Sequence, residues 1–177
     1  VAALDFDGTL TSGDQLSAEA VEAIDRVRRN GLLVVLVTGR IGAEFAHDHP
    51  DIGEHVDALV LENGAVAVIN GQTHPVAAPV DAALDAALTD RGVPFRRGEV
   101  LVAVDGKHAS AVLEVIGELG LDCQIIRNRS ALMVLPAGVN KASGLVVALE
   151  SLGLSPHNAV GVGDAQNDHA FLSRCQV

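Results

Sequence analysis

Residues 1–8 read VAALDFDG, and this stretch determines the fold that we predict. A short apolar run closed by an Asp-Gly pair is typical of a buried strand that enters a loop. Two further apolar runs end in polar residues in the same way, Leu32–Val37 before Thr38 and Ala58–Leu61 before Glu62. The sequence therefore predicts three buried strands, each followed by a polar loop.

Predicted helices separate these strands. Ser17 is a good N-cap for a helix from Ala18 to about Arg29, and a short helix after Arg40 is expected to end at Pro50. The pattern returns near the end of the chain, with a helix over 140–152, a strand over 159–162 and a helix after residue 166. Alternating strands and helices of this length predict an α/β fold with a doubly wound parallel sheet.

The pattern changes between residues 76 and 135. We predict a helix over 81–91, a strand over 99–105, a helix over 108–119, and strands over 124–127 and 131–135. This order is typical of a small α+β sheet with helices on one side. We therefore predict a discontinuous core of residues 1–75 and 136–177, interrupted by a small inserted domain of residues 76–135.

Composition excludes several classes of partner. The chain has 23 acidic and 12 basic residues, and its net charge of -11 repels nucleic acids and anionic membranes. It has no Trp or Tyr for stacking on bases, and no apolar run as long as a membrane span. Cys123 and Cys175 lie far apart, which fits a reducing compartment. We expect a cytoplasmic protein with no nucleic-acid or membrane partner.

Polar residues with chemical potential follow the predicted strands. Asp5 and Asp7 follow the first strand, Thr38 follows the second, Asp164 follows the last, and Lys141 begins a helix. Because ligands bind at the carboxyl ends of strands in α/β sheets, these side chains should converge at one edge. Three carboxylates that lie together repel each other unless a hard cation lies among them. Mg²⁺, which prefers oxygen ligands, is the cofactor that this pattern predicts.

Four motifs in this order resemble those of the haloacid dehalogenase superfamily. They are Asp5-Phe6-Asp7-Gly8-Thr9-Leu10, Thr38-Gly39-Arg40, Lys141, and Gly163-Asp164-Ala165-Gln166-Asn167-Asp168. The stretches LPAGVNK at 135–141 and ENGA at 62–65 look like the Cof-type branch, which carries a cap domain between the second and third motifs. Each motif alone is weak, but four in order are specific. The resemblance implies a Rossmannoid hydrolase core and identifies residues 76–135 as the cap.

The resemblance also implies roles for the motif residues. Asp5 would be the nucleophile that forms an aspartyl-phosphate, and Asp7 would be the acid and base. Thr38, Gly39 and Lys141 would bind the phosphoryl oxygens. The Asp5 and Asp164 side chains and the Asp7 carbonyl would hold Mg²⁺, with Asn167 and Asp168 supporting that shell. The free N–H groups at the start of the Lys141 helix would also favour an anion.

The implied substrate is a small-molecule phosphate ester, either a sugar phosphate or a small phospho-acid. Arg40, Asn63, Arg96 and Arg127 are candidate substrate contacts. The inserted segment holds six of the 12 basic residues, and we hypothesise that some of its arginines face the core and bind the substrate, with Arg96, Arg97, Arg127 and Arg129 as the ones to test. The alternative is that these arginines only solvate the edges of the sheet.

Two other functions compete with a phosphatase. The first is a phosphate-sensing or regulatory module with little turnover, part of a larger polypeptide. The family core continues with another strand after the fourth motif, so we expect a fused or missing C-terminal segment. The second is a signalling receiver domain, which is disfavoured because receivers carry their phosphorylated Asp in mid-chain and have no inserted domain.

Two further patterns were weighed as ligand sites. Gly161-Val162-Gly163 does not continue as a dinucleotide-binding motif, because Gln166 replaces the third glycine. The acidic and histidine residues over 47–55 could suggest zinc. Pro50 breaks the helix that would align them, so we interpret them as a solvated acidic turn.

Overall fold

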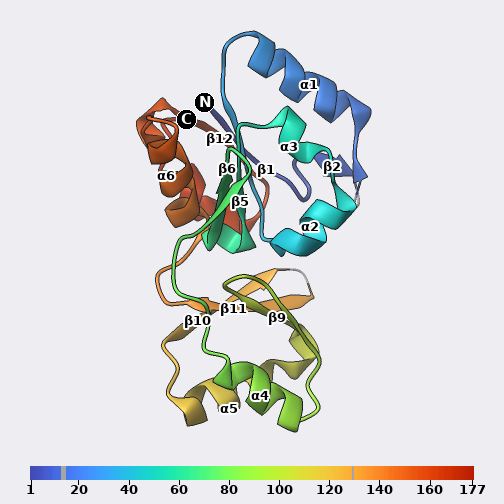
Figure 1. Cartoon of the computed structure of the whole chain (residues 1–177), viewed down its shortest axis with the longest axis vertical. Helices are drawn as coiled ribbons and strands as arrows, with labels where there is room; N and C mark the ends of the chain where they lie inside the picture. The colour runs from blue at the N-terminus through green and yellow to red at the C-terminus, as the bar shows by residue number, and fades with distance from the viewer. Residues whose placement is uncertain (13–14, 129) are drawn as a thin grey trace.

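The computed structural model describes residues 1–12, 15–128 and 130–177 and contains two main sheets (Figure 1). The first has six strands, in the order β12 (Val160–Val162), β1 (Ala2–Asp5), β4 (Val34–Val37), β5 (Ala58–Leu61), β6 (Val66–Ile69) and β7 (Gln72–Pro75). A separate short hairpin is formed by β2 (Thr11–Ser12) and β3 (Gln15–Leu16). The first sheet carries the predicted polar loops at its carboxyl ends.

The four strands that the sequence predicts for this sheet, β12, β1, β4 and β5, are parallel, which confirms the α/β fold. The antiparallel strands β6 and β7 were not predicted. Asn70 and Gly71 join them with φ angles of 52° and 73°, as an Asn-Gly hairpin turn requires. This dipeptide was the signal for the hairpin. All four residues of β7 are exposed, so no apolar pattern accompanied it.

Helices cover both faces of the first sheet, as a doubly wound fold requires (Figure 1). One face carries α1 (Ala18–Arg29), α2 (Gly42–Asp48) and α3 (Ile52–His55), and the other carries α6 (Lys141–Ser151) and α7 (His169–Leu172). Alternate residues of β4 pack into the two layers: Val34 and Leu36 into the first, Val35 and Val37 into the second. None of the helices that the structure describes has both the length and the apolar composition needed to span a bilayer.

The second sheet has the order β10 (Cys123–Asn128), β11 (Ala131–Pro136), β9 (Val102–Asp105) and β8 (Phe95–Arg97). Helices α4 (Ala83–Asp90) and α5 (Ala109–Leu119) cover the face away from the first sheet (Figure 1). Strand β8 was not predicted, because its three residues include two arginines and form no apolar run. The boundaries of the inserted domain at residues 76 and 135 remain a prediction.

The other face of the second sheet packs against the first sheet through apolar side chains. Leu101, Ala103, Met133 and Leu135 belong to the same buried cluster as Phe6. Their neighbours in the strands pack instead against α4 and α5. The second sheet therefore covers the end of the first sheet at which the predicted site lies (Figure 1).

Gly144 tests the packing of α6 on this scaffold. A Cβ at Gly144 would lie 2.5 Å from Val60 Cγ1 and 2.6 Å from Gly64 Cα, so the helix would have to shift. We expect Gly144→Ala to lower the free energy of unfolding by about 1–3 kcal/mol. In the control Gly117→Ala, on α5, the new Cβ meets nothing within 4 Å. This variant should raise the free energy of unfolding by up to ~1 kcal/mol. Urea denaturation measures both, and equal effects would contradict the packing argument.

Candidate active site

The carboxyl ends of the strands bring the predicted motif residues together. Asp5 is the last residue of β1, Asp164 follows β12, and Lys141 is the first residue of α6. One carboxylate oxygen from each of Asp5, Asp164 and Asp168 lies within 4.8 Å of the other two. The convergence of Asp5 and Asp164, which come from opposite ends of the chain, is therefore present in the structure.

Lys141 forms a buried ion triad with two of these acids. Its Nζ lies 2.6 Å from Asp5 Oδ1 and 2.5 Å from Asp168 Oδ1. All three residues are at most 3 % exposed. Burial raises the pKa of the Asp5 carboxyl above its ordinary value, and the Lys141 ammonium opposes that rise. Two buried carboxylates and one ammonium leave an excess of negative charge, which a second cation would offset.

Asp168 supports this arrangement on both of its oxygens. While Oδ1 accepts from Lys141, Oδ2 accepts from the backbone N–H groups of Asp164 and Ala165, at 3.1 and 2.9 Å. Asp168 thus fixes the lysine and the Asp164 loop at once. This is the supporting position that the family resemblance implies for Asp168. Asn167 instead donates from Nδ2 to Asn63 Oδ1, at 3.1 Å.

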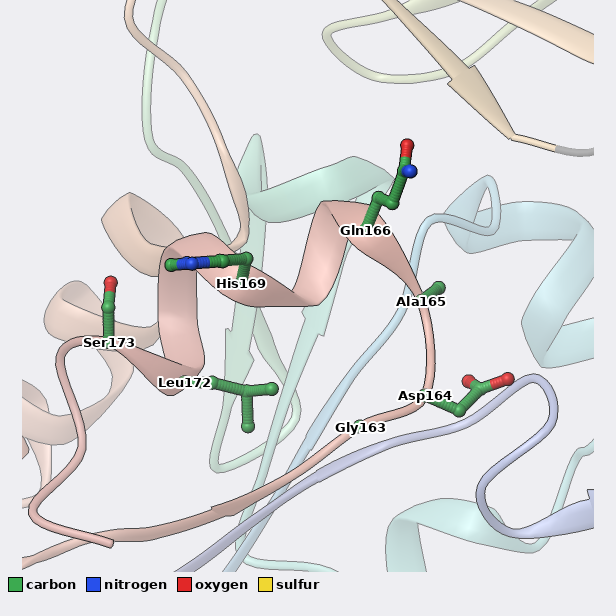
Figure 2. Close-up of a pocket in the computed structure, with 7 residues that line it drawn as sticks. All are labelled: Gly163, Asp164, Ala165, Gln166, His169, Leu172 and Ser173. Atoms are coloured by element: carbon green, nitrogen blue, oxygen red, sulfur yellow. The ribbon is translucent and has the colours of Figure 1, made fainter.

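The oxygens of Asp5 and Asp164 that Lys141 does not bind suit a hard cation. The Thr9 hydroxyl links them, at 3.3 Å from Asp5 Oδ2 and 3.5 Å from Asp164 Oδ1. Gly8 has a φ of 95°, and a Cβ there would lie 2.5 Å from Asp164 Oδ2, so a larger residue would displace the Asp164 carboxylate. Figure 2 shows the Asp164 side chain turned toward the loop that follows β1. These oxygen donors fit Mg²⁺. Thr9 was not among the predicted site residues.

The Arg40 guanidinium binds the carboxylate of Asp7. Its Nη2 donates to Asp7 Oδ1 at 2.7 Å, and its Nε donates to the same carboxylate at 3.1 and 3.2 Å. The Thr38 hydroxyl donates to Asp7 Oδ2 at 3.4 Å, and Thr38 and Gly39 are both buried. The second motif thus surrounds Asp7. That Arg40 contacts substrate stays a prediction.

Asn63 lies at the same end of the sheet but is buried under the second sheet. It is 1 % exposed, donates from Nδ2 to Met133 Sδ at 2.7 Å and accepts from Asn167. Its side chain therefore joins the first sheet, the second sheet and the loop after β12. In this structure Asn63 connects elements of the site, and a contact with substrate stays a prediction.

The candidate arginines of the inserted segment divide between the two faces of the second sheet. Arg96 pairs in register with Ala103, which faces the first sheet, and its Nη1 lies 2.5 Å from Glu44 Oε2 of α2. Arg127 pairs with Leu132, which packs against α4 and α5. Because side chains alternate along a strand, Arg127 lies on the face away from the site. The structure does not bring Arg127 to the core residues.

Arg97 follows the same alternation. It pairs with Val102, whose side chain packs among α4 and α5, and its Nη1 donates to Asp85 Oδ1 of α4 at 3.0 Å. Arg129 lies outside the described residues. Among the three of these arginines that the structure describes, only Arg96 therefore lies on the face toward the first sheet.

The helix that begins at Lys141 differs from the sequence prediction at its N-terminus. Asn140 Oδ1 accepts from the N–H groups of Ala142 and Ser143, at 3.0 and 3.2 Å, in a capping box. The prediction that free N–H groups favour an anion here is wrong for these two, because the N-cap side chain already binds them. Lys141 must act mainly through its own charge.

The histidine-rich stretch over 47–55 forms no metal-binding group among the described residues. His55 Nδ1 lies 2.9 Å from Asp25 Oδ1. His49 is half-buried, and its ring packs against Phe6 and Phe45 with centroid distances of 4.8 and 5.1 Å. The interpretation of a solvated turn is therefore wrong for His49, because two phenylalanine rings cover it.

A cavity of about 670 Å³ lies beside Asp164 (Figure 2). It is lined by Gly163, Asp164, Ala165, Gln166, His169, Leu172 and Ser173. Asp164 is its one lining residue from the acidic cluster, and that carboxylate is turned toward the loop after β1. The cavity therefore borders the acidic cluster through Asp164 alone.

Comparison with known proteins agrees with this geometry. The family model described as haloacid dehalogenase-like hydrolase matches residues 1–175. The phosphoglycolate phosphatase of Methanothermobacter thermautotrophicus is 30% identical over 180 residues, which cover 96% of this chain and 79% of that protein.

Solved structures show the same fold. A haloacid dehalogenase-like hydrolase from Bacteroides thetaiotaomicron superposes with a TM-score of 0.76 at 18% identity, over 98% of this chain and 85% of its own. A sugar phosphatase of subclass IIB gives a TM-score of 0.74 at 18% identity, over 98% and 84%.

The buried triad generates a stability prediction that does not depend on activity. Lys141→Met would leave the Asp5 and Asp168 carboxylates buried without their ammonium, and we expect the free energy of unfolding to fall by about 3–5 kcal/mol. The control Lys107→Met removes an ammonium that is paired with Asp105, from a side chain that is 69% exposed. This change should alter the free energy of unfolding by about 0–1 kcal/mol. Urea denaturation near neutral pH measures both. Similar losses in the two variants would contradict the triad.

Proposed function

The chain belongs to the haloacid dehalogenase-like hydrolases, and from this premise we propose that it hydrolyses the phosphomonoester of a small phosphorylated metabolite through an aspartyl-phosphate on Asp5. The observation that carries the proposal is the buried Asp5 carboxylate, whose Oδ1 accepts from Lys141 and whose Oδ2 is linked to Asp164 through the Thr9 hydroxyl. The Asp5 carboxylate thus lies at the carboxyl end of the sheet, where ligands of α/β folds bind.

Asp5 acts as the nucleophile in this proposal. An Asp5 oxygen bonds to phosphorus while the bond from phosphorus to the ester oxygen breaks. Lys141 holds Asp5 in place and stabilises negative charge on the phosphoryl oxygens, and the Thr38 hydroxyl, buried at the end of β4, binds a further oxygen. Charge neutralisation and positioning supply most of the catalysis in phosphoryl transfer.

Asp7 acts as the general acid and then as the general base in this proposal. It gives a proton to the departing ester oxygen, then takes one from the water that attacks the aspartyl-phosphate, and inorganic phosphate is released. The Asp7 side chain is 18% exposed, so water can reach it. Arg40 and Thr38 fix its position through three donors. A base held beside its target is what general acid–base catalysis requires.

Mg²⁺ is the cofactor that we propose for the Asp5 and Asp164 carboxylates and the Asp7 carbonyl. When bound, it would supply positive charge that offsets the phosphoryl oxygens and the excess negative charge of the triad. The protein residues would set its position: Asp168 holds the Asp164 backbone, and Gly8 allows Asp164 to approach the loop after β1.

A small phospho-acid is the substrate class that we favour. Relatives at about 30% identity, among them the protein from Methanothermobacter thermautotrophicus, are phosphoglycolate phosphatases. Arg40 places a guanidinium beside Asp7, and its positive charge would favour the carboxylate of a leaving glycolate. Arg96, on the face of the second sheet toward the site, offers a second cation. A neutral sugar would use neither charge.

Turnover tests the nucleophile. With Mg²⁺ present, we expect 2-phosphoglycolate to be hydrolysed with a higher kcat/KM than glucose 6-phosphate, as measured by phosphate release. Asp5→Asn removes the attacking oxygen and should lower kcat by a factor of about 10⁴ or more. Asp90→Asn, at an exposed position on α4, is the control and should leave it unchanged. Undiminished turnover in Asp5→Asn would remove the mechanism, and no turnover in the wild type would favour a phosphate-sensing module.

Metal removal tests the cofactor separately. Dialysis against a chelator should abolish phosphate release, and added Mg²⁺ should restore it. Calorimetric titration should show that Asp164→Asn weakens Mg²⁺ binding by about tenfold or more, because one oxygen ligand loses its charge. Asp122→Asn, at an exposed position directly before β10, serves as the control. Full activity of the chelator-treated enzyme would contradict a metal requirement.

A further inference from the structure

Glu62 is a buried carboxylate that the proposed mechanism does not use. It follows β5 directly and is 0% exposed. Its Oε1 accepts from the N–H of Glu99 at 2.9 Å, and its Oε2 accepts from the N–H groups of Val100 and Leu101 at 3.0 and 3.1 Å. A carboxylate of the first sheet is thus bound by three successive N–H groups of the loop between β8 and β9.

Such a carboxylate is held without a lysine or arginine among these contacts. Three oriented backbone N–H groups make an anion-binding concavity, and hydrogen bonds to a charged acceptor are stronger than neutral ones. The loop accommodates the carboxylate closely: a Cβ at Gly98 would lie 2.4 Å from Glu62 Oε1. The contact therefore depends on the charge of Glu62 and on the absence of a side chain at Gly98.

The turn of residues 62–64, to which Glu62 belongs, also binds the second motif, residues 38–40. The N–H of Glu62 donates to the Arg40 carbonyl at 3.0 Å, and the N–H of Asn63 donates to the Thr38 carbonyl at 3.1 Å. Gly64 packs against the backbone of Asn140, just before Lys141, where a Cβ would lie 1.8 Å from the Asn140 oxygen. One three-residue turn therefore contacts the second motif, the start of α6 and the loop of the second sheet.

The backbone of the turn is strained in a way that this arrangement explains. Glu62 and Asn63 both have positive φ angles, 55° and 53°, although neither is glycine. Such conformations cost about 1–3 kcal/mol each and persist where the surroundings impose them, often at functional sites. Here they direct the Glu62 carboxylate to the second sheet while both N–H groups stay on the second motif.

We propose that Glu62 is a positioning residue, which fixes the loop of residues 98–101 to the catalytic end of the first sheet and so sets how the second sheet binds the leaving group of the substrate. The loop leads directly from β8, which carries Arg96 toward the first sheet. Release of the loop would move β8 relative to Asp5 and Asp7. The proposal rests on the proposed phosphatase function for its effect on substrate, and on the structure alone for its effect on the loop.

Glu62→Gln tests the proposal with the least change in shape. Glutamine keeps the size and the backbone preference of glutamate but presents an N–H₂ group to a backbone N–H. We expect the amides of 99–101 to exchange with deuterium about tenfold faster or more, while amides of β4 and β5 change little. For 2-phosphoglycolate we expect KM to rise about tenfold and kcat to change by less than about threefold, because Asp5, Asp7 and Lys141 are untouched.

Two controls and a second variant make the result decisive. Glu114→Gln makes the same charge change at an exposed position of α5 and should alter neither exchange nor KM. Gly98→Ala pushes the carboxylate out of the loop from the other side and should reproduce the effect of Glu62→Gln, whereas Gly117→Ala should not. If Glu62→Gln does not fold, Gly98→Ala decides the question.

Three results would overturn the proposal. The first is unchanged exchange at 99–101 in both variants. The second is a uniform rise of exchange through both sheets with KM unaltered, which would mean that Glu62 only stabilises the fold. The third is a fall in kcat with no change in KM. If the wild type hydrolyses no phosphate ester, the proposed function fails, and the exchange measurement still decides whether Glu62 holds the loop.

Discussion

Two buried carboxylates that share one ammonium are the constraint on which the site depends. Asp5, Lys141 and Asp168 come from the first strand, the sixth helix and the segment after the last strand, so the triad forms only when distant parts of the chain have folded together. Removing either sign of charge from such a group leaves the other buried and uncompensated, which is far more costly than losing a surface pair. The same excess of negative charge that makes the triad demanding also makes it a place for a divalent cation.

A third buried carboxylate, that of Glu62, is stabilised in a different way. Asp5 is neutralised by a side-chain cation, whereas Glu62 is bound by three backbone N–H groups. A point charge can serve a carboxylate that must react, because it also attracts an incoming phosphate. Backbone N–H groups suit a carboxylate that has only a positioning role, because they satisfy its oxygens without adding a net positive charge. The division separates the chemical part of the site from the part that connects the two sheets.

The elements that depend on local sequence patterns could be predicted from the sequence. The buried runs before Asp5 and Glu62 and the Ser17 cap gave β1, β5 and α1, since apolar period and capping are local properties. The short strands β7, which is exposed, and β8, which contains two arginines, lack an apolar pattern and were missed. The face on which Arg127 lies depends on strand register, and the partners of Glu62 lie 37 to 39 residues away along the chain. Those facts follow from tertiary packing, which no local pattern records.

The neighbouring arginines of β8 carry a consequence for how such a protein could change its ligand. Arg96 and Arg97 are chemically identical, yet one confronts the catalytic end and the other is tied to α4. Deleting or inserting a single uncharged residue upstream in that strand would exchange their faces without altering the net charge. The geometry of a cation opposite the phosphate would then change in one genetic step, while the catalytic acids stayed where they are. A one-residue shift in the register of β8 can thus change which ligand the protein prefers.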